Sequence, residues 1–221
     1  MAQTNTKDNI IDITNINEKV YNLLKERIIH LEYPPGYKIS IRNLQDELGV
    51  SNSPIKNALF RLAGEDLLEI SSRKGTYVNE VTEKDIEEIE QVRTILEVGA
   101  AEIAVQKVTD VQLKKLENLY MQAHFPKKKI DYSQFMEIDS RFHMELINIT
   151  GNERLIHVYK KLNAHMQIVR FQFARNRKEP LPWTQSDHLQ ILESLKEKDV
   201  KKLKNAISNH LNAARKAFLE K

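Results

Sequence analysis

The sequence contains no cysteine, and it has no long run of apolar residues. Without cysteine the chain forms no disulfide bonds, and a metal site in it has no thiolate ligand. No apolar stretch approaches the roughly 18–20 residues that a membrane-spanning helix requires. The N-terminal segment "MAQTNTKDNIIDITNIN" also lacks the apolar core of a signal peptide and any lipidation motif. We therefore expect a soluble cytoplasmic protein without a membrane partner, in which residues 1–15 form a flexible leader.

An excess of charge of one sign is also missing. The formal net charge of the 221 residues is +3, and residues 1–80 carry ten Lys and Arg residues against eleven Asp and Glu residues. This balance excludes a strongly basic protein. A nucleic-acid partner therefore has to be argued from where the charges lie.

The few glycine and proline residues are clustered, and the clusters separate regular segments. Turn signals occur in "EYPPGYKIS" (32–40), in "GVSNSP" (49–54) and at a hairpin tip, "SRKG" (72–75). Between them, apolar residues recur with the i, i+3, i+4, i+7 spacing of helices, which predicts helices over 16–31, 41–48 and 53–65. The composition then changes to that of two strands, over 67–70 and 75–81.

From Thr82 onward the pattern is helical throughout. Thr82 and Asp85 form a helix-start signature of the capping-box type. The expected helices cover residues 83–106, 110–124, 131–149, 152–176, 183–197 and 199–219. The sequence therefore predicts a mainly α protein: a winged helix-turn-helix domain over 16–81, then an all-helical antiparallel bundle of six helices over 82–221.

The first domain has the organisation of a DNA-reading unit. A short helix, a turn with Gly49, a capped helix and a hairpin follow one another, and in such units the second helix presents its N-terminal residues to base edges. Basic side chains at or near these segments are Lys38, Arg42, Lys56 and Arg61, and the wing tip holds Arg73, Lys74 and Gly75. The alternatives are a three-helix scaffold with solvated charges and a winged helix that binds protein.

Four side chains in the second domain suggest a metal site. Asp139 and His143 lie four residues apart at the edge of an apolar helix face, and His188 and His210 lie in the apolar stripes of the last two helices. A buried polar group left unpaired costs roughly 1–3 kcal/mol. If the three helices converge, one divalent ion satisfies all four groups, and this donor set suits zinc, nickel, manganese or iron. The alternative is a set of core histidines satisfied by hydrogen bonds. The other histidines we expect to have no such partners: His30, His124, His157 and His165.

The stretch "PPGYKISIRNLQDELGVSNSPIKNALFRLAGEDLLEISSRKGTYV" resembles the DNA-binding domain of the GntR family of bacterial transcription regulators. The resemblance implies that Gly75 is the wing glycine and that DNA contacts come from Arg42, Ser51, Asn52, Ser53 and Lys56. Asn52 and Lys56 stand where the family usually has arginine. Because Asn favours adenine and Lys acts as a point charge, the operator can differ from the common one.

The segments "DSRFH", "DHLQILESLKEKD" and "NHL" resemble the metal-binding pattern of the FCD effector domain, and "VRTILEVGAAEIA" resembles its first helix. The resemblance implies that Asp139, His143, His188 and His210 are metal ligands and that a small organic acid binds beside the metal. Arg93 is then a candidate clamp for the acid, with a surface pair to Glu97 as the alternative. Trp183 is a candidate pocket wall, with a core anchor at a helix start as the alternative. Arg170 and Arg175 are weaker candidates.

Together these features predict a regulator and not an enzyme. It would be a cytoplasmic homodimer that binds a pseudo-palindromic double-stranded operator under the control of a carboxylate effector. Two alternatives stay open: a metal sensor without an organic effector, and a metal-dependent hydrolase or oxygenase.

Overall fold

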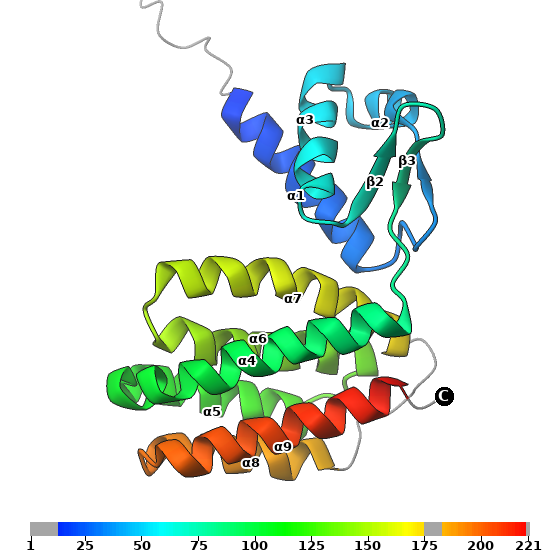
Figure 1. The fold of residues 1–221 in the computed structure, drawn as a ribbon. Coiled ribbons are helices and arrows are strands. Elements are labelled where there is room, and N and C mark those ends of the chain that lie inside the picture. The colour runs from blue at the N-terminus through cyan, green and yellow to red at the C-terminus, as the bar shows by residue number, and fades with distance from the viewer. Residues whose placement is uncertain (1–12, 175–182, 220–221) are drawn as a thin grey trace, which may run out of the picture. The chain divides into compact units, whose positions relative to one another are not determined.

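The computed structural model describes residues 13–174 and 183–219 of the chain. The chain divides into two compact units, residues 1–80 and 81–221, and each is described by itself. The described part is mainly helical with one small antiparallel sheet in the first unit, which confirms the predicted fold class (Figure 1). Among the described helices, none combines the length and the apolar character needed to cross a membrane.

The first unit contains three helices. They are α1 (Ile13–Ile29), α2 (Ile41–Leu48) and α3 (Asn52–Ala63). Helix α2 is capped by Ser40, whose side chain accepts a hydrogen bond from the backbone N–H of Asn43. It ends at Gly49, whose φ of +63° lies in the left-handed region that glycine tolerates best.

The wing has three strands, β1 (Lys38–Ile39), β2 (Leu68–Ser71) and β3 (Gly75–Val78), in the order β1-β3-β2. Both pairings are antiparallel, and Tyr77 in β3 lies opposite Lys38 on one side and Glu69 on the other. The prediction of a turn alone over 32–40 was therefore wrong. Strand β1 has only two residues, too few to show a period-two pattern, and it exists because β3 offers it a partner.

In the core of the first unit, the inner face of α3 packs against α1. The fully buried side chains on these two helices include Leu24, Ile28, Ile55, Leu59 and Leu62. Pro54 lies in the first turn of α3, where its missing N–H removes no helical hydrogen bond. The packing leaves the opposite face of α3 exposed to solvent.

The second unit consists, in its described residues, of six helices whose bounds lie within two residues of the prediction. They are α4 (Glu83–Lys107), α5 (Asp110–His124), α6 (Tyr132–Ile149), α7 (Glu153–Ala174), α8 (Trp183–Lys196) and α9 (Val200–Leu219). Consecutive helices reverse direction (Figure 1). Capping boxes at Thr82, Thr109 and Asp131 start α4, α5 and α6.

The core of the bundle joins helices that are distant in sequence. Helix α4 packs against α6, α7 and α9, and α8 packs against α5 and α9. One apolar cluster contains Leu116, Phe142, Ile191, Leu195 and Leu203, which come from four different helices. This packing brings the faces of α6, α8 and α9 that carry aspartate and histidine side chains together in the interior of the bundle.

Candidate metal centre and nucleic-acid interface

Three helices of the bundle supply a buried cluster of metal donors. Helix α6 carries Asp139 and His143 one turn apart, α8 carries His188, and α9 carries His210. Their exposed fractions are 6%, 0%, 1% and 2%, and one donor atom from each lies within 4.8 Å of the others. An ion bound at about 2.0–2.2 Å from each donor places the donors roughly 3–4 Å apart. Separations of up to 4.8 Å slightly exceed this range, so the four residues would hold a single divalent ion after a small inward shift of their side chains.

The donor atoms face one another directly. His143 Nε2 lies 3.1 Å from His210 Nε2, and His188 Nε2 lies 3.1 Å from Asp139 Oδ1. The same Asp139 oxygen is 3.7 Å from His143 Nε2. Three imidazoles and one carboxylate form a set that borderline divalent metals prefer, and it leaves room for further ligands.

Glu97 on α4 orients the first of these histidines. Its Oε2 lies 2.7 Å from His143 Nδ1, and because an ionised carboxylate only accepts, Nδ1 must carry the proton. Nε2 then directs its lone pair into the cluster, the carboxylate–histidine arrangement found at many metal sites. Burial lowers the pKa of His143 to about 3, so its imidazole is neutral at pH 7.

The charge of Glu97 is held by several donors. Burial by itself raises its pKa, but His143 and Arg93 outweigh burial and the net pKa lies well below the usual range. Its Oε1 accepts from Arg93 Nε at 2.7 Å and from the Tyr159 hydroxyl at 2.6 Å. The Arg93–Glu97 pair could be predicted from its i, i+4 spacing. The alternative that placed this pair on the surface is wrong, because both side chains are buried. The contact with His143 joins α4 to α6 and has no signal within either helix.

His124 is a second residue behind the donors that the sequence prediction missed. Its Nε2 lies 3.0 Å from Nδ1 of His188, so the expectation that His124 has no such partner was wrong. Burial, followed by the neighbouring His188, lowers the pKa of His124 to about 4. The contact arises because α5 packs against α8, which the periodicity of one helix does not reveal.

Arg170 on α7 holds the remaining oxygen of the aspartate. Its Nη2 lies 2.8 Å from Asp139 Oδ2, which leaves Oδ1 facing the imidazoles. Burial raises the pKa of Asp139, but Arg170 and the histidines outweigh burial and lower it well below the usual value. Asp139 is therefore ionised, as a metal ligand must be.

A small cavity adjoins the cluster. Its lining includes Asp139 and His210 together with Arg93 and Arg170. Its volume is about 20 Å³, enough for about one water molecule. Arg93 Nη2 and Arg170 Nη1 are buried and have no hydrogen-bond partner among the described residues. The side chain of Trp183, at the start of α8, and all of Arg175 lie outside the described residues.

The predicted DNA-contacting residues of α2 and α3 lie on the solvent side of the first unit. Arg42, Ser51, Asn52, Ser53 and Lys56 are all exposed. Ser51 is the N-cap residue of α3, but its side chain makes no capping hydrogen bond, so its hydroxyl is left for another partner.

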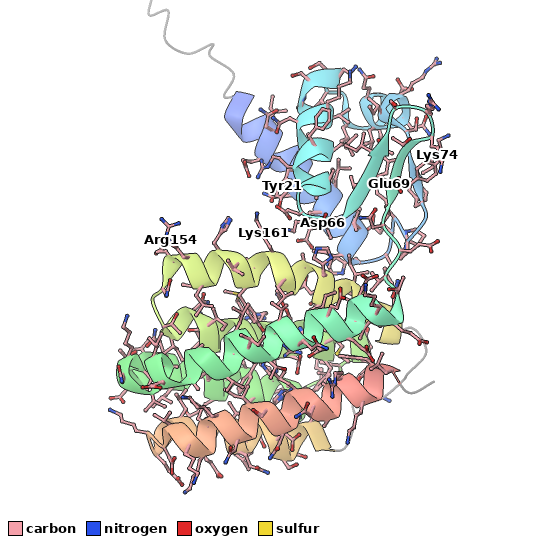
Figure 2. All side chains as sticks on the ribbon, viewed as in Figure 1. Tyr21, Asp66, Glu69, Lys74, Arg154 and Lys161 are labelled. Atoms are coloured by element: carbon pink, nitrogen blue, oxygen red, sulfur yellow. The ribbon has the colours of Figure 1, made fainter. Side chains whose placement is uncertain are left out.

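The predicted wing residues gather at one hairpin. Figure 2 labels Lys74 at the turn that joins β2 to β3. Gly75 has a φ of +109°, and a Cβ there would lie 3.2 Å from Lys38 Cε. The backbone conformation is the reason for glycine here, because the flexible end of the Lys38 side chain could shift by a few tenths of an ångström. Lys38, Arg73 and Lys74 are exposed.

The cations of this unit fall into two groups. Those that hold the fold are paired: Lys25 with Glu65, Arg27 with Glu47 and Arg61 with Glu18. The second group makes no ion pair with a carboxylate within the part of the chain that the structure describes: Lys38, Arg42, Lys56, Arg73 and Lys74. A net charge near zero therefore coexists with unpaired cations on α2, on α3 and at the wing.

Comparisons with known proteins give the same division. Residues 16–78 match the bacterial regulatory proteins of the gntR family, and residues 88–213 match the FCD domain. The chain is 25% identical over 196 residues to the HTH-type transcriptional repressor RspR of Escherichia coli K12, covering 89% of this chain and 86% of that protein. Two solved structures share its fold. E. coli McbR/YncC has a TM-score of 0.81 at 22% identity, with 92% and 96% of the two chains covered. A putative GntR transcriptional regulator from Rhodococcus sp. RHA1 has a TM-score of 0.78 at 16% identity, with 93% and 98% covered.

Proposed function

This chain belongs to the GntR family of bacterial transcription regulators and carries an FCD domain, and from this premise we propose how its DNA binding is controlled. It is a DNA-binding transcription regulator, and its relatives are regulators and not enzymes. In our proposal, a small carboxylate bound beside a divalent metal in the second unit sets the affinity of the first unit for its operator. The protein acts in the cytoplasm, where its operator lies.

The donor cluster supports the metal part of the proposal. Asp139, His143, His188 and His210 would hold zinc, nickel, manganese or iron. The bound ion would supply a Lewis acid that attracts an oxygen atom of the effector. The chain itself prepares the site, since Glu97 sets the tautomer of His143 and Arg170 fixes the orientation of Asp139.

The effector part rests on one observation: two buried guanidinium groups with unused N–H donors line the cavity beside the metal donors. Leaving a buried charged donor unpaired is costly. A carboxylate that accepts from Arg93 Nη2 and Arg170 Nη1 would remove this cost with charge-assisted hydrogen bonds. Because the cavity holds about one water molecule, its walls must move apart to admit an acid. Such a movement is what an effector needs, since it acts only by favouring one of two conformations.

The operator part rests on the exposed face of α3 and the unpaired cations of the wing. Winged-helix proteins commonly bind as two-fold dimers, so we propose a homodimer on a pseudo-palindromic site. Helix α4 offers a surface for the second copy, because Ile95 is 71% exposed and Val92 is 42% exposed on the same face. Other apolar residues of this helix, namely Ile89, Val98 and Ile103, are only partly exposed.

The proposal is tested by screening organic acids for thermal stabilisation of the metal-loaded protein and of the chelated protein. We expect hits only with metal, and we expect each hit to change the affinity for duplex DNA. His188→Ala and His210→Ala should lose both the metal and the response, whereas His157→Ala, at an exposed histidine, should keep both. Unchanged metal content in the first two variants would refute the site. If metal alone changes DNA affinity and no acid adds to it, the protein is a metal sensor.

A further inference from the structure

Helix α3 exposes a large apolar side chain that the fold does not explain. Phe60 is 64% exposed. The inner face of the helix is already filled by Ile55, Leu59 and Leu62, each buried. An exposed phenyl ring gains little for folding, because most of its apolar surface stays in water. Its position therefore points to a partner outside the unit.

Phe60 lies on the same face as the residues predicted to contact DNA. Ser53, Lys56, Asn57 and Phe60 are all exposed and follow the spacing i, i+3, i+4, i+7. Recognition helices that lie along the major groove present base-contacting side chains with this spacing. From Asn52 to Phe60 the helix rises about 12 Å, which is comparable to the width of the groove.

The surroundings of Phe60 suit an approach to DNA. The sequence of α3, "NSPIKNALFRLA", contains no acidic residue that would repel phosphates. The next residues on this face of the helix are Ala63 and Gly64, at i+3 and i+4 from Phe60, so no bulky side chain beyond the ring holds this face away from DNA. The adjacent Arg61 is turned to the fold, where it pairs with Glu18 and lies 3.8 Å from the centre of the Tyr21 ring.

We infer that the phenyl ring of Phe60 contacts the 5-methyl group of a thymine in the operator. The methyl group of thymine is the apolar feature that the major groove presents, and the polar base edges would lose hydrogen bonds to water beneath a phenyl ring. The inference rests on the proposed reading of DNA by α3. It adds a specificity-determining residue to those predicted from the sequence, one that selects thymine in each half-site.

The experiment starts from a duplex that the wild-type protein selects from a randomised pool. Each thymine of that duplex is then replaced by deoxyuridine, which removes only the methyl group. We expect one thymine in each half-site at which this change weakens wild-type binding about fourfold, the value of one buried methyl group. Phe60→Ala should weaken binding to the thymine duplex by at least as much and should no longer distinguish the two duplexes.

The control is Ile70→Ala, which removes another exposed apolar side chain of the same unit, 39% exposed on β2. It should keep the preference for thymine. If Phe60→Ala keeps the full penalty for deoxyuridine, the ring does not contact the methyl group and the inference is wrong. If the variant instead changes only the oligomeric state, measured by light scattering, Phe60 serves a protein contact and the inference is also wrong. If the wild type enriches no duplex at all, operator reading fails, and the inference fails with it.

Discussion

The contact between Glu97 and His143 makes a prediction about metal affinity that does not depend on knowing the effector. Three donors face the two oxygens of this buried carboxylate: Arg93 Nε, the Tyr159 hydroxyl and His143 Nδ1. Glu97→Gln keeps the shape of the side chain, but it removes the charge and replaces one acceptor oxygen by an NH₂ group. The NH₂ group must then face one of these three donors, from which it cannot accept a hydrogen bond.

The size of the effect follows from these contacts. Breaking a buried ion pair by neutralising one partner costs about 3–5 kcal/mol of unfolding free energy. Loss of the hydrogen bond that orients a metal ligand typically costs about 10–100-fold in metal affinity, or about 1.4–2.7 kcal/mol. The two effects are separable, because the first appears in chelated protein and the second only in metal binding.

The assay is urea unfolding with a chelator present, followed by competition for zinc with a chromophoric chelator. Glu102→Gln is the matched control, since Glu102 lies on the same helix in an exposed pair with Lys204. It should cost at most about 1 kcal/mol and leave zinc affinity unchanged. Tyr159→Phe removes one donor but leaves the bond to His143, so it should cost about 1 kcal/mol with little change in zinc affinity. A zinc affinity of Glu97→Gln within twofold of the wild type would refute the reasoning.

Burial lowers the folded-state pKa values of His124, His143 and His188 below the usual imidazole value. The unfolded chain then binds more protons below about pH 6.5, so the stability of chelated protein should fall as pH falls. The loss should be up to about 1.4 kcal/mol per pH unit for each of His124 and His143, and His188 should add to it in the same direction. Urea midpoints that do not change between pH 7 and pH 5 would contradict this. Lys56→Ala should leave the melting temperature unchanged and reduce the slope of log affinity for duplex DNA against log salt by about 0.9 for each subunit of the dimer. Arg61→Ala should instead cost about 1 kcal/mol of stability and leave the slope unchanged. The reverse result would mean that the two groups of cations have been misassigned. Gly75→Ala places a Cβ at a φ of +109° and 3.2 Å from Lys38 Cε. It should therefore destabilise the first unit by about 1–3 kcal/mol in urea unfolding and weaken duplex binding in fluorescence anisotropy. Wild-type values in both measurements would show that the wing tolerates a side chain.

Much of the fold follows from local signals in the sequence. The six helices of the bundle were predicted to within two residues, because capping boxes such as that at Thr82 and apolar periodicity act within one or two turns. Helices α2 and α3 were predicted for the same reason. Strand β1 was not predicted, since its two residues carry no strong local pattern.

The sequence by itself determined which residues share a helix face, and thus that Asp139 lies beside His143 and that Arg93 can pair with Glu97. Only the tertiary structure decided that Glu97 contacts His143, 46 residues away, and that His124 contacts His188, 64 residues away. The same holds for Arg170, which holds Asp139 from another helix. The physical reason is range: a helix face is fixed by backbone geometry within a few residues, whereas these contacts exist only once separate helices have packed against one another.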